Sequence, residues 1–263
     1  MVSVSEFYFQ KIYKYLIGSY LNGVPELINL SRTSTVMRAV FYRKKLFTFI
    51  LNRNLESLLL PFGIQLRVLQ ALLESTGAVI SGSIVLQAYI GANWEGSDLD
   101  IYVRDYRKRK HGKKQLNKYR SSFSNFVLDK KKNCTARKLY NNSEVFNHIG
   151  EINELHNSEN GRTVQIISVS VWSLRKVRNV VRTFDLSIVA NYYTGSTWKF
   201  LFFHHILNRR MLFLPRLPYT RPLGRSNFVR ILKYMNRGFR FVKRDKPISI
   251  HDGLWNVLDE AFD

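Results

Sequence analysis

One short stretch constrains the fold of this chain more than any other. A β-branched run, Ala78–Ile80, leads through Gly82 and Ser83 into the apolar segment Ile84–Ile90, and a second strand-like run follows at Leu99–Val103. The Gly-Ser pair is typical of a tight turn that opens a helix. The sequence therefore predicts a strand, a turn, a helix and a second strand in immediate succession.

Two carboxylates frame the start of the second strand. Successive side chains of a strand alternate between its faces, so Asp98 and Asp100 project together while Leu99 points into the core. A carboxylate pair on a rigid strand suits Mg²⁺, which takes oxygen ligands and is commonly held by one or two carboxylates with substrate phosphates. The backbone N–H groups at Gly82 and Ser83 suit the phosphates themselves, because helix N-termini bind anions.

The segments on either side of this stretch differ from it in the spacing of their apolar residues. Residues 1–75 carry apolar residues at helical spacing, residues 76–200 hold the short β-branched runs, and residues 201–263 return to a helical pattern. We expect an α+β protein with a mixed β-sheet core, flanked by helical N- and C-terminal segments. Residues 24–38 faintly resemble the middle of an F-box, although leucines at this spacing are more often the core of a helical bundle.

Further elements are expected within the core and after it. Thr163–Val169 and Phe184–Val189 are strand candidates, whereas residues 141–161 are predicted to form a helix and a loop. Helical spacing returns through residues 202–212, and Phe228–Met235 predicts a helix that Gly238 closes. No internal repeat stands out.

The order of these motifs resembles the DNA polymerase β-type nucleotidyltransferase superfamily, and especially uncharacterised fungal nucleotidyltransferase-like proteins. The resemblance covers residues 76–195 and rests on the Gly-Ser pair, the Asp-x-Asp strand and a later single Asp on another strand. It implies that Asp185 joins Asp98 and Asp100 in holding two metal ions, Mg²⁺ or Mn²⁺, with a nucleoside triphosphate as substrate. Gly82, Ser83 and Ser97 are then the expected nucleotide-binding residues.

The charge of the chain points to a polyanionic partner. Forty-one Lys and Arg against nineteen Asp and Glu give a net charge of +22, a surplus that attracts RNA, DNA or nucleotides. Cys134 is the only cysteine, so neither an internal disulfide nor a thiolate zinc site is expected. We expect an intracellular protein, cytoplasmic or nuclear with a mitochondrial location as the open alternative, that neither enters a membrane nor carries a secretory signal.

Much of the surplus lies in a basic insert at residues 104–135. Its cations include a cluster that we predict to contact nucleic-acid phosphates: Arg107, Lys108, Arg109, Lys110, Lys113 and Lys114. The alternative is a solvated, flexible arm. No motif that recognises nucleic-acid bases accompanies the insert. Contact with the phosphates of RNA or DNA is therefore expected to be independent of base sequence.

These observations predict an enzyme that transfers a nucleoside monophosphate from a triphosphate such as ATP to an acceptor hydroxyl, with release of pyrophosphate. The favoured acceptor is a nucleic-acid 3′ end, and a protein or small-molecule hydroxyl is the variant. One alternative is a catalytically inactive nucleotidyltransferase fold that serves as an RNA-binding component of a ribonucleoprotein. Another is an adaptor in which the F-box-like segment of the N-terminal helices recruits a ligase complex as its protein partner.

The excess of cations in the insert leads to a testable expectation. If its cations neutralise phosphates, the logarithm of the affinity for single-stranded RNA should fall linearly with the logarithm of the salt concentration. The slope should be about −0.7 for each phosphate contact. Replacing Arg107, Lys108, Arg109 and Lys110 with Gln should flatten this slope and weaken binding equally across base sequences, as fluorescence anisotropy would measure. A slope that the four replacements leave untouched would identify the insert as a solvated arm.

Overall fold

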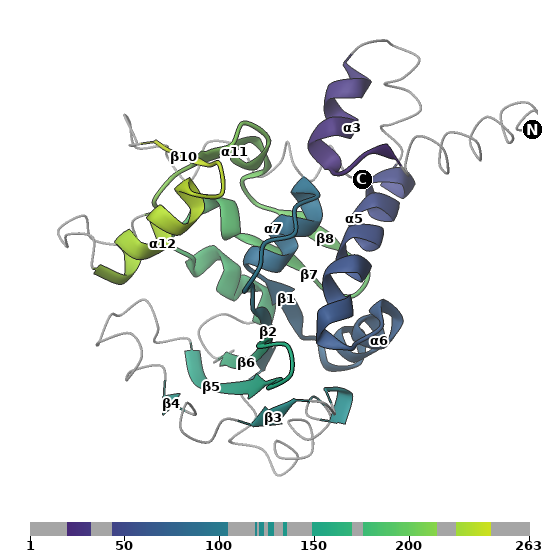
Figure 1. The fold of residues 1–263 in the computed structure, drawn as a ribbon, viewed down its shortest axis with the longest axis vertical. Coiled ribbons are helices and arrows are strands. Elements are labelled where there is room, and N and C mark those ends of the chain that lie inside the picture. Colours follow the sequence, from purple (N-terminus) through teal and green to yellow (C-terminus); the bar gives the residue numbers. More distant parts are fainter. Residues whose placement is uncertain are drawn as a thin grey trace, which may run out of the picture.

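The computed structural model describes residues 20–32, 44–104, 119, 121–123, 126–128, 134–135, 149–169, 176–214 and 225–242. Within these residues, eight strands form one mixed sheet in the order β3-β5-β6-β2-β1-β7-β8, with β4 paired to β5 (Figure 1). Strands β2 and β6 run parallel, and the other pairs in this sheet are antiparallel. The strands are β1 (Val79–Ser81), β2 (Leu99–Arg104), β3 (Val127–Leu128), β4 (Cys134–Thr135), β5 (Ile149–His156), β6 (Thr163–Val169), β7 (Asn191–Tyr193) and β8 (Trp198–Phe200).

Helices precede, interrupt and follow the sheet. The α-helices of the described residues are α3 (Val24–Ser31), α5 (Lys44–Leu59), α6 (Leu66–Thr76), α7 (Ser83–Ile90), α11 (Phe203–Leu207) and α12 (Arg225–Met235). The same part of the chain contains three 3₁₀ helices: η2 (Leu60–Phe62), η4 (Val177–Thr183) and η5 (Ser187–Val189). Two further short strands, β9 (Arg210–Met211) and β10 (Arg240–Phe241), form a small parallel pair near the C-terminus. The expected α+β class with a mixed sheet is confirmed.

The predicted strand, turn, helix and strand are all present as β1, α7 and β2. Gly82, directly before α7, has a φ of +81° that a residue with a side chain rarely adopts, and it turns the chain from β1 into the helix. Seven of the eight residues of α7 are buried, since the helix packs between other helices and the sheet. The turn that carries the candidate phosphate site is therefore fixed by buried structure on both sides.

One face of the sheet is apolar. Leu99, Ile101 and Ile166 from β2 and β6 belong to a continuous core with buried leucines of α5 and α6. In Figure 1 these two helices lie on the opposite side of the sheet from α12. This packing directs the alternate residues of β2, Asp100 among them, to the α12 side.

A polar row crosses the other face. The strand register places Ser81 opposite Asp100, Asp100 opposite Gln165, and Gln165 opposite Glu154. Directly paired residues project to the same face, so these four side chains form a line across β1, β2, β6 and β5. Further along the same face, Tyr102 and Ile167 pack with η4 in a separate apolar cluster.

Three expectations about local structure are wrong. Residues 149–156, predicted as part of a helix and loop, form strand β5, whose register shifts between Ile149 and Ile152 and so hides the alternation of a strand. The predicted strand Phe184–Val189 is instead an isolated bridge at Leu186 followed by η5. Met211 lies in β9 and not in a helix.

The basic insert contributes to the core as well as to the charge. Its aromatic residues Tyr119, Phe123 and Phe126 are buried in the same cluster as the leucines of α6, and β3 pairs with β5. Across the described part of the chain, no single helix is long and apolar enough to cross a bilayer; Leu46–Phe62 and Leu66–Thr76 reach that length and composition together, but with a bend of 98°.

Two glycines of similar backbone conformation give a test of the packing between α3 and α7. A Cβ on Gly91 would lie 1.8 Å from the carbonyl oxygen of Asn22, whereas a Cβ on Gly96 would meet nothing within 4 Å, and the two φ angles are +67° and +64°. Gly96→Ala should cost about 1–2 kcal/mol of stability from backbone strain alone. Gly91→Ala should cost about 3 kcal/mol or more, because a backbone clash adds to the same strain. Urea denaturation measures both, and equal losses would contradict the packing described.

Candidate active site

The site is built where β1 and β2 meet the first turn of α7. Ser81 pairs with Asp100 across the two strands, so Gly82 comes next to the Asp100 carboxylate. A Cβ on Gly82 would lie 3.0 Å from Asp100 Oδ2. The absence of a side chain at this position is therefore what lets the backbone of the turn approach the carboxylate.

Asp100 sits in an environment that disfavours its charge. Burial, with the neighbouring charge of Asp98 adding to it, raises the pKa of Asp100 to about 7, although Arg230 and Lys233 oppose the shift. Asp98 lies directly before β2, two residues before Asp100, and both residues are half-buried. A second carboxylate this near to Asp100, in a poorly solvated place, makes the pair a candidate cation site.

Asp185 is held by an arginine. Its backbone carbonyl accepts a hydrogen bond of 2.6 Å from the Leu214 N–H, and its carboxylate lies 2.7 Å from Arg230 Nη1. The Asp185 side chain is 15% exposed and that of Arg230 41%. The residue lies in a bend between η4 and η5, and the predicted strand is absent there.

Helix α12 brings a group of cations to these acids. The stretch 233–239 carries a weaker resemblance to the same superfamily in the sequence, but no site role was predicted for its cations. Arg230, Lys233 and Arg237 are spaced three and four residues apart, so they share one side of the helix and the turn that follows it. The charges of Asp98 and Asp100 act on Lys233, and Asp98 acts on Arg237. The spacing was visible in the sequence, but nothing local indicated which element the three residues would face.

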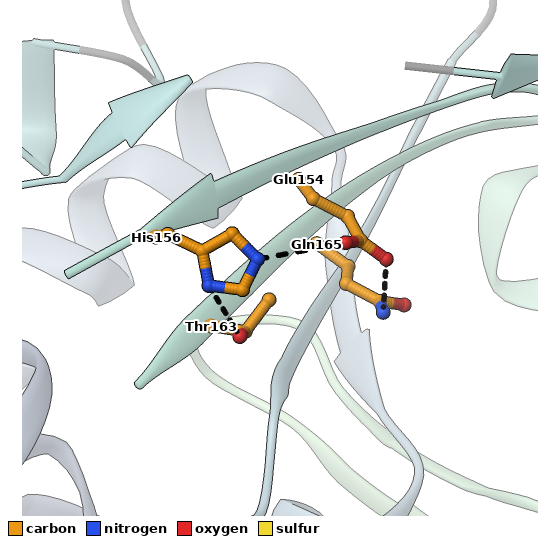
Figure 2. Close-up of polar contacts among 4 residues, drawn as sticks. All are labelled: Glu154, His156, Thr163 and Gln165. Carbon is orange, nitrogen blue, oxygen red and sulfur yellow. Dashed lines mark hydrogen bonds and ion pairs between the residues drawn. The ribbon is translucent and has the colours of Figure 1, made fainter. Parts of the chain in front are cut away.

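A second polar cluster extends the row onto β5 and β6, which carry Glu154, His156, Thr163 and Gln165 (Figure 2). Gln165 Nε2 donates a hydrogen bond of 3.1 Å to Glu154 Oε1, and Glu154 Oε2 lies 3.7 Å from His156 Nε2. The His156 Nδ1 atom is 3.1 Å from the Thr163 hydroxyl. Glu154 also acts on Asp100 and raises its pKa, so the negative field of the site reaches β5.

The remaining predicted site residues fall into two groups. Ser83 begins α7 and is half-buried, and Ser97 is buried beside Asp98, its hydroxyl 3.5 Å from Arg237 Nη2. The predicted nucleic-acid contacts Arg107, Lys108, Arg109, Lys110, Lys113 and Lys114 lie outside the described residues.

The carboxylates of Asp98 and Asp100 fit a bound cation, whereas the three carboxylates that include Asp185 are not arranged to share one. Asp98 and Asp100 offer carboxylate oxygens, which hard divalent cations prefer as ligands. The surroundings of Asp100 also penalise its unneutralised charge. Among the described residues, no group of three His, Cys, Asp or Glu side chains is arranged to hold a metal ion. Asp185, the expected third carboxylate, is engaged by Arg230.

Comparison with known proteins identifies one family. Residues 42–209 match the Gabija anti-defense 2 family, and no curated protein matches the chain. A solved structure of a CCA-adding enzyme in an apo form is similar at a TM-score of 0.40 and 15% identity. The match covers 74% of this chain and 41% of that enzyme chain, so this protein spans less than half the length of that enzyme.

The raised pKa of Asp100 predicts how stability depends on pH. The carboxyl titrates at about 7 when folded and at about 3.8 in the unfolded chain, so between these values the folded protein binds more protons. In the absence of divalent cations, the free energy of unfolding should therefore fall as the pH rises from about 4 to about 7. Asp100→Asn should flatten this dependence and raise stability at pH 8 by about 1–3 kcal/mol.

Urea denaturation in a chelating buffer measures this dependence. Glu95→Gln is the matched control, because Glu95 is an exposed carboxylate in the loop that leads to Asp98. A pH dependence that Asp100→Asn leaves unchanged would show that Asp100 is ionised as readily in the folded chain as in the unfolded one.

Proposed function

The chain belongs to the Gabija anti-defense 2 family, and we propose that it is a magnesium-dependent nucleotidyltransferase. It would transfer a nucleoside monophosphate from a triphosphate to an acceptor hydroxyl and release pyrophosphate. The observation that carries the proposal is the contact between the Gly82 turn and Asp100. A backbone anion site at the start of α7 then adjoins a carboxylate pair that needs a cation, and metal-bound phosphates require both.

Each residue has a distinct part in this proposal. Asp98 and Asp100 hold the divalent cation, which neutralises the charge that develops on the phosphates during an in-line displacement. The N–H groups of Gly82 and Ser83 seat the phosphates that leave, and Ser97 contributes its hydroxyl beside Asp98. Asp185, once released by Arg230, serves the acceptor side of the site.

The proposed acceptor is a nucleic-acid 3′ end. The net charge of +22 far exceeds the few cations that a triphosphate requires, and such a surplus favours a polynucleotide with several phosphates in contact. The name of the family, Gabija anti-defense 2, leads us to propose further that the reaction opposes a defence system of that name.

One observation favours a second candidate, a catalytically inactive nucleotidyltransferase fold that binds RNA. Asp185 is engaged by Arg230 at 2.7 Å, and a site without its third carboxylate has no use for two metal ions. The two candidates differ in one readily measured property. The enzyme incorporates labelled nucleotide into an acceptor, whereas the inactive fold binds RNA and leaves nucleoside triphosphates unchanged.

Removal of the carboxylate pair tests the proposed activity. Purified protein should be incubated with each labelled triphosphate, Mg²⁺ or Mn²⁺, and a mixture of RNA, DNA and protein acceptors. Asp98→Ala and Asp100→Asn should each reduce transfer by about a thousandfold or more, because the charge stabilisation of the transition state is lost. Glu95→Gln should transfer at the wild-type rate. Full activity in the Asp98 and Asp100 variants would place the chemistry elsewhere.

A further inference from the structure

Arg237 occupies an unusual position at the edge of the candidate site. Its guanidinium carbon lies 4.3 Å from the centre of the Trp94 ring and 5.4 Å from that of Tyr234. Its Nη2 atom lies 3.5 Å from the hydroxyl of Ser97, the residue directly before Asp98. The two aromatic contacts fix the plane of the guanidinium within reach of the carboxylate pair.

The hydrogen bonding of this guanidinium is incomplete. Arg237 Nη1 is buried and has no hydrogen-bond partner, and the Nη2 contact with Ser97 is at the limit of a hydrogen bond. A buried N–H donor without an acceptor is costly, so such groups are rare and call for an acceptor that arrives later. Since the Arg237 side chain as a whole is only half-buried, a small rotation within the aromatic contacts would present Nη1 to a ligand.

The surrounding charges select the kind of acceptor. Arg230 and Lys233 lie on the same side of α12 as Arg237, and the neighbouring acids on this face are Asp98, Asp100, Asp185 and Glu154. Arg230 is engaged with Asp185, whereas Arg237 forms no ion pair among the described residues. When a cation neutralises Asp98 and Asp100, the field at Arg237 becomes more positive and favours an anion.

We infer that Arg237 binds the phosphate tail of the nucleoside triphosphate, with Trp94 and Tyr234 holding its guanidinium in place. The inference rests on the proposed function, since it assigns a residue to the substrate of that site. A planar guanidinium forms paired hydrogen bonds with phosphate oxygens that a lysine ammonium cannot reproduce. Arg237 is therefore expected to discriminate by charge and geometry and to leave the base of the nucleotide unread.

Calorimetric titration of the full-length protein in Mg²⁺ tests this inference with three probes: inorganic tripolyphosphate, ATP and adenosine. Arg237→Gln should weaken the binding of tripolyphosphate and ATP by about ten- to a hundredfold, which is the effect of losing a charged hydrogen bond. Arg237→Lys should give an intermediate loss, and adenosine binding should not change. The matched control is Arg240→Gln, since Arg240 is exposed on β10, and its affinities should stay within about twofold of wild type.

The outcomes separate this inference from the proposed function. Binding of tripolyphosphate by Arg237→Gln as tight as by Arg240→Gln would overturn the inference, as would a wild-type protein that binds no tripolyphosphate. If Arg237→Gln does not fold, the test uses Arg237→Lys, provided that its melting temperature equals that of the wild type. An unchanged affinity of Arg237→Lys for tripolyphosphate would then overturn the inference. Loss of phosphate binding without nucleotide transfer by the wild type would uphold the phosphate site and refute the enzyme. If the Arg237→Gln protein transfers nucleotide with an unchanged KM for ATP, the proposed enzyme is upheld and the phosphate-binding role of Arg237 is refuted.

Discussion

The close approach of a backbone turn to the half-buried carboxylate of Asp100 organises the candidate site. Gly82 lets the chain pass within van der Waals reach of Asp100, and the strands on either side of the turn are held by pairing between β1 and β2. Burial and Asp98 together make the ionised form of Asp100 unfavourable. A carboxyl group whose charge is disfavoured, with three cations around it, supports the proposed binding of a metal ion and phosphates.

Helix α12 completes this balance of charge from the opposite end of the sequence. Ile231 and Tyr234 are buried against residues of α7 and η5, and this packing carries Arg230, Lys233 and Arg237 to the acids. Arg230 then neutralises Asp185, while Arg237 stays beside Trp94 with a donor to spare. In the arrangement described, the third carboxylate of the proposed triad is thus occupied by a side chain, and the binding of metal and phosphate would compete with that ion pair.

The parts of the site that are encoded locally could be predicted from the sequence. Strand alternation places Asp98 and Asp100 on one side, and the Gly-Ser turn followed by an apolar helix was visible in consecutive residues. The convergence of α12 on the acids depends on packing between residues more than 120 positions apart, such as Trp94 and Tyr234, which no local pattern reveals. Strand β5 was not predicted because a register shift breaks the alternation of its buried and exposed residues. The 3₁₀ helix η5 was predicted as a strand because Ser187, Ile188 and Val189 are all buried, as residues of an interior strand are.

The proposed function depends most directly on where a cation and a nucleotide bind. A crystal structure of the protein with Mn²⁺ and a non-hydrolysable nucleoside triphosphate analogue would locate both, because manganese is identified by its anomalous scattering. We expect a manganese peak within direct ligand distance, roughly 2–2.5 Å, of carboxylate oxygens of Asp98 and Asp100, with the triphosphate at the N-terminus of α7. A manganese ion bound elsewhere, or a nucleotide away from the Gly82 turn, would contradict it.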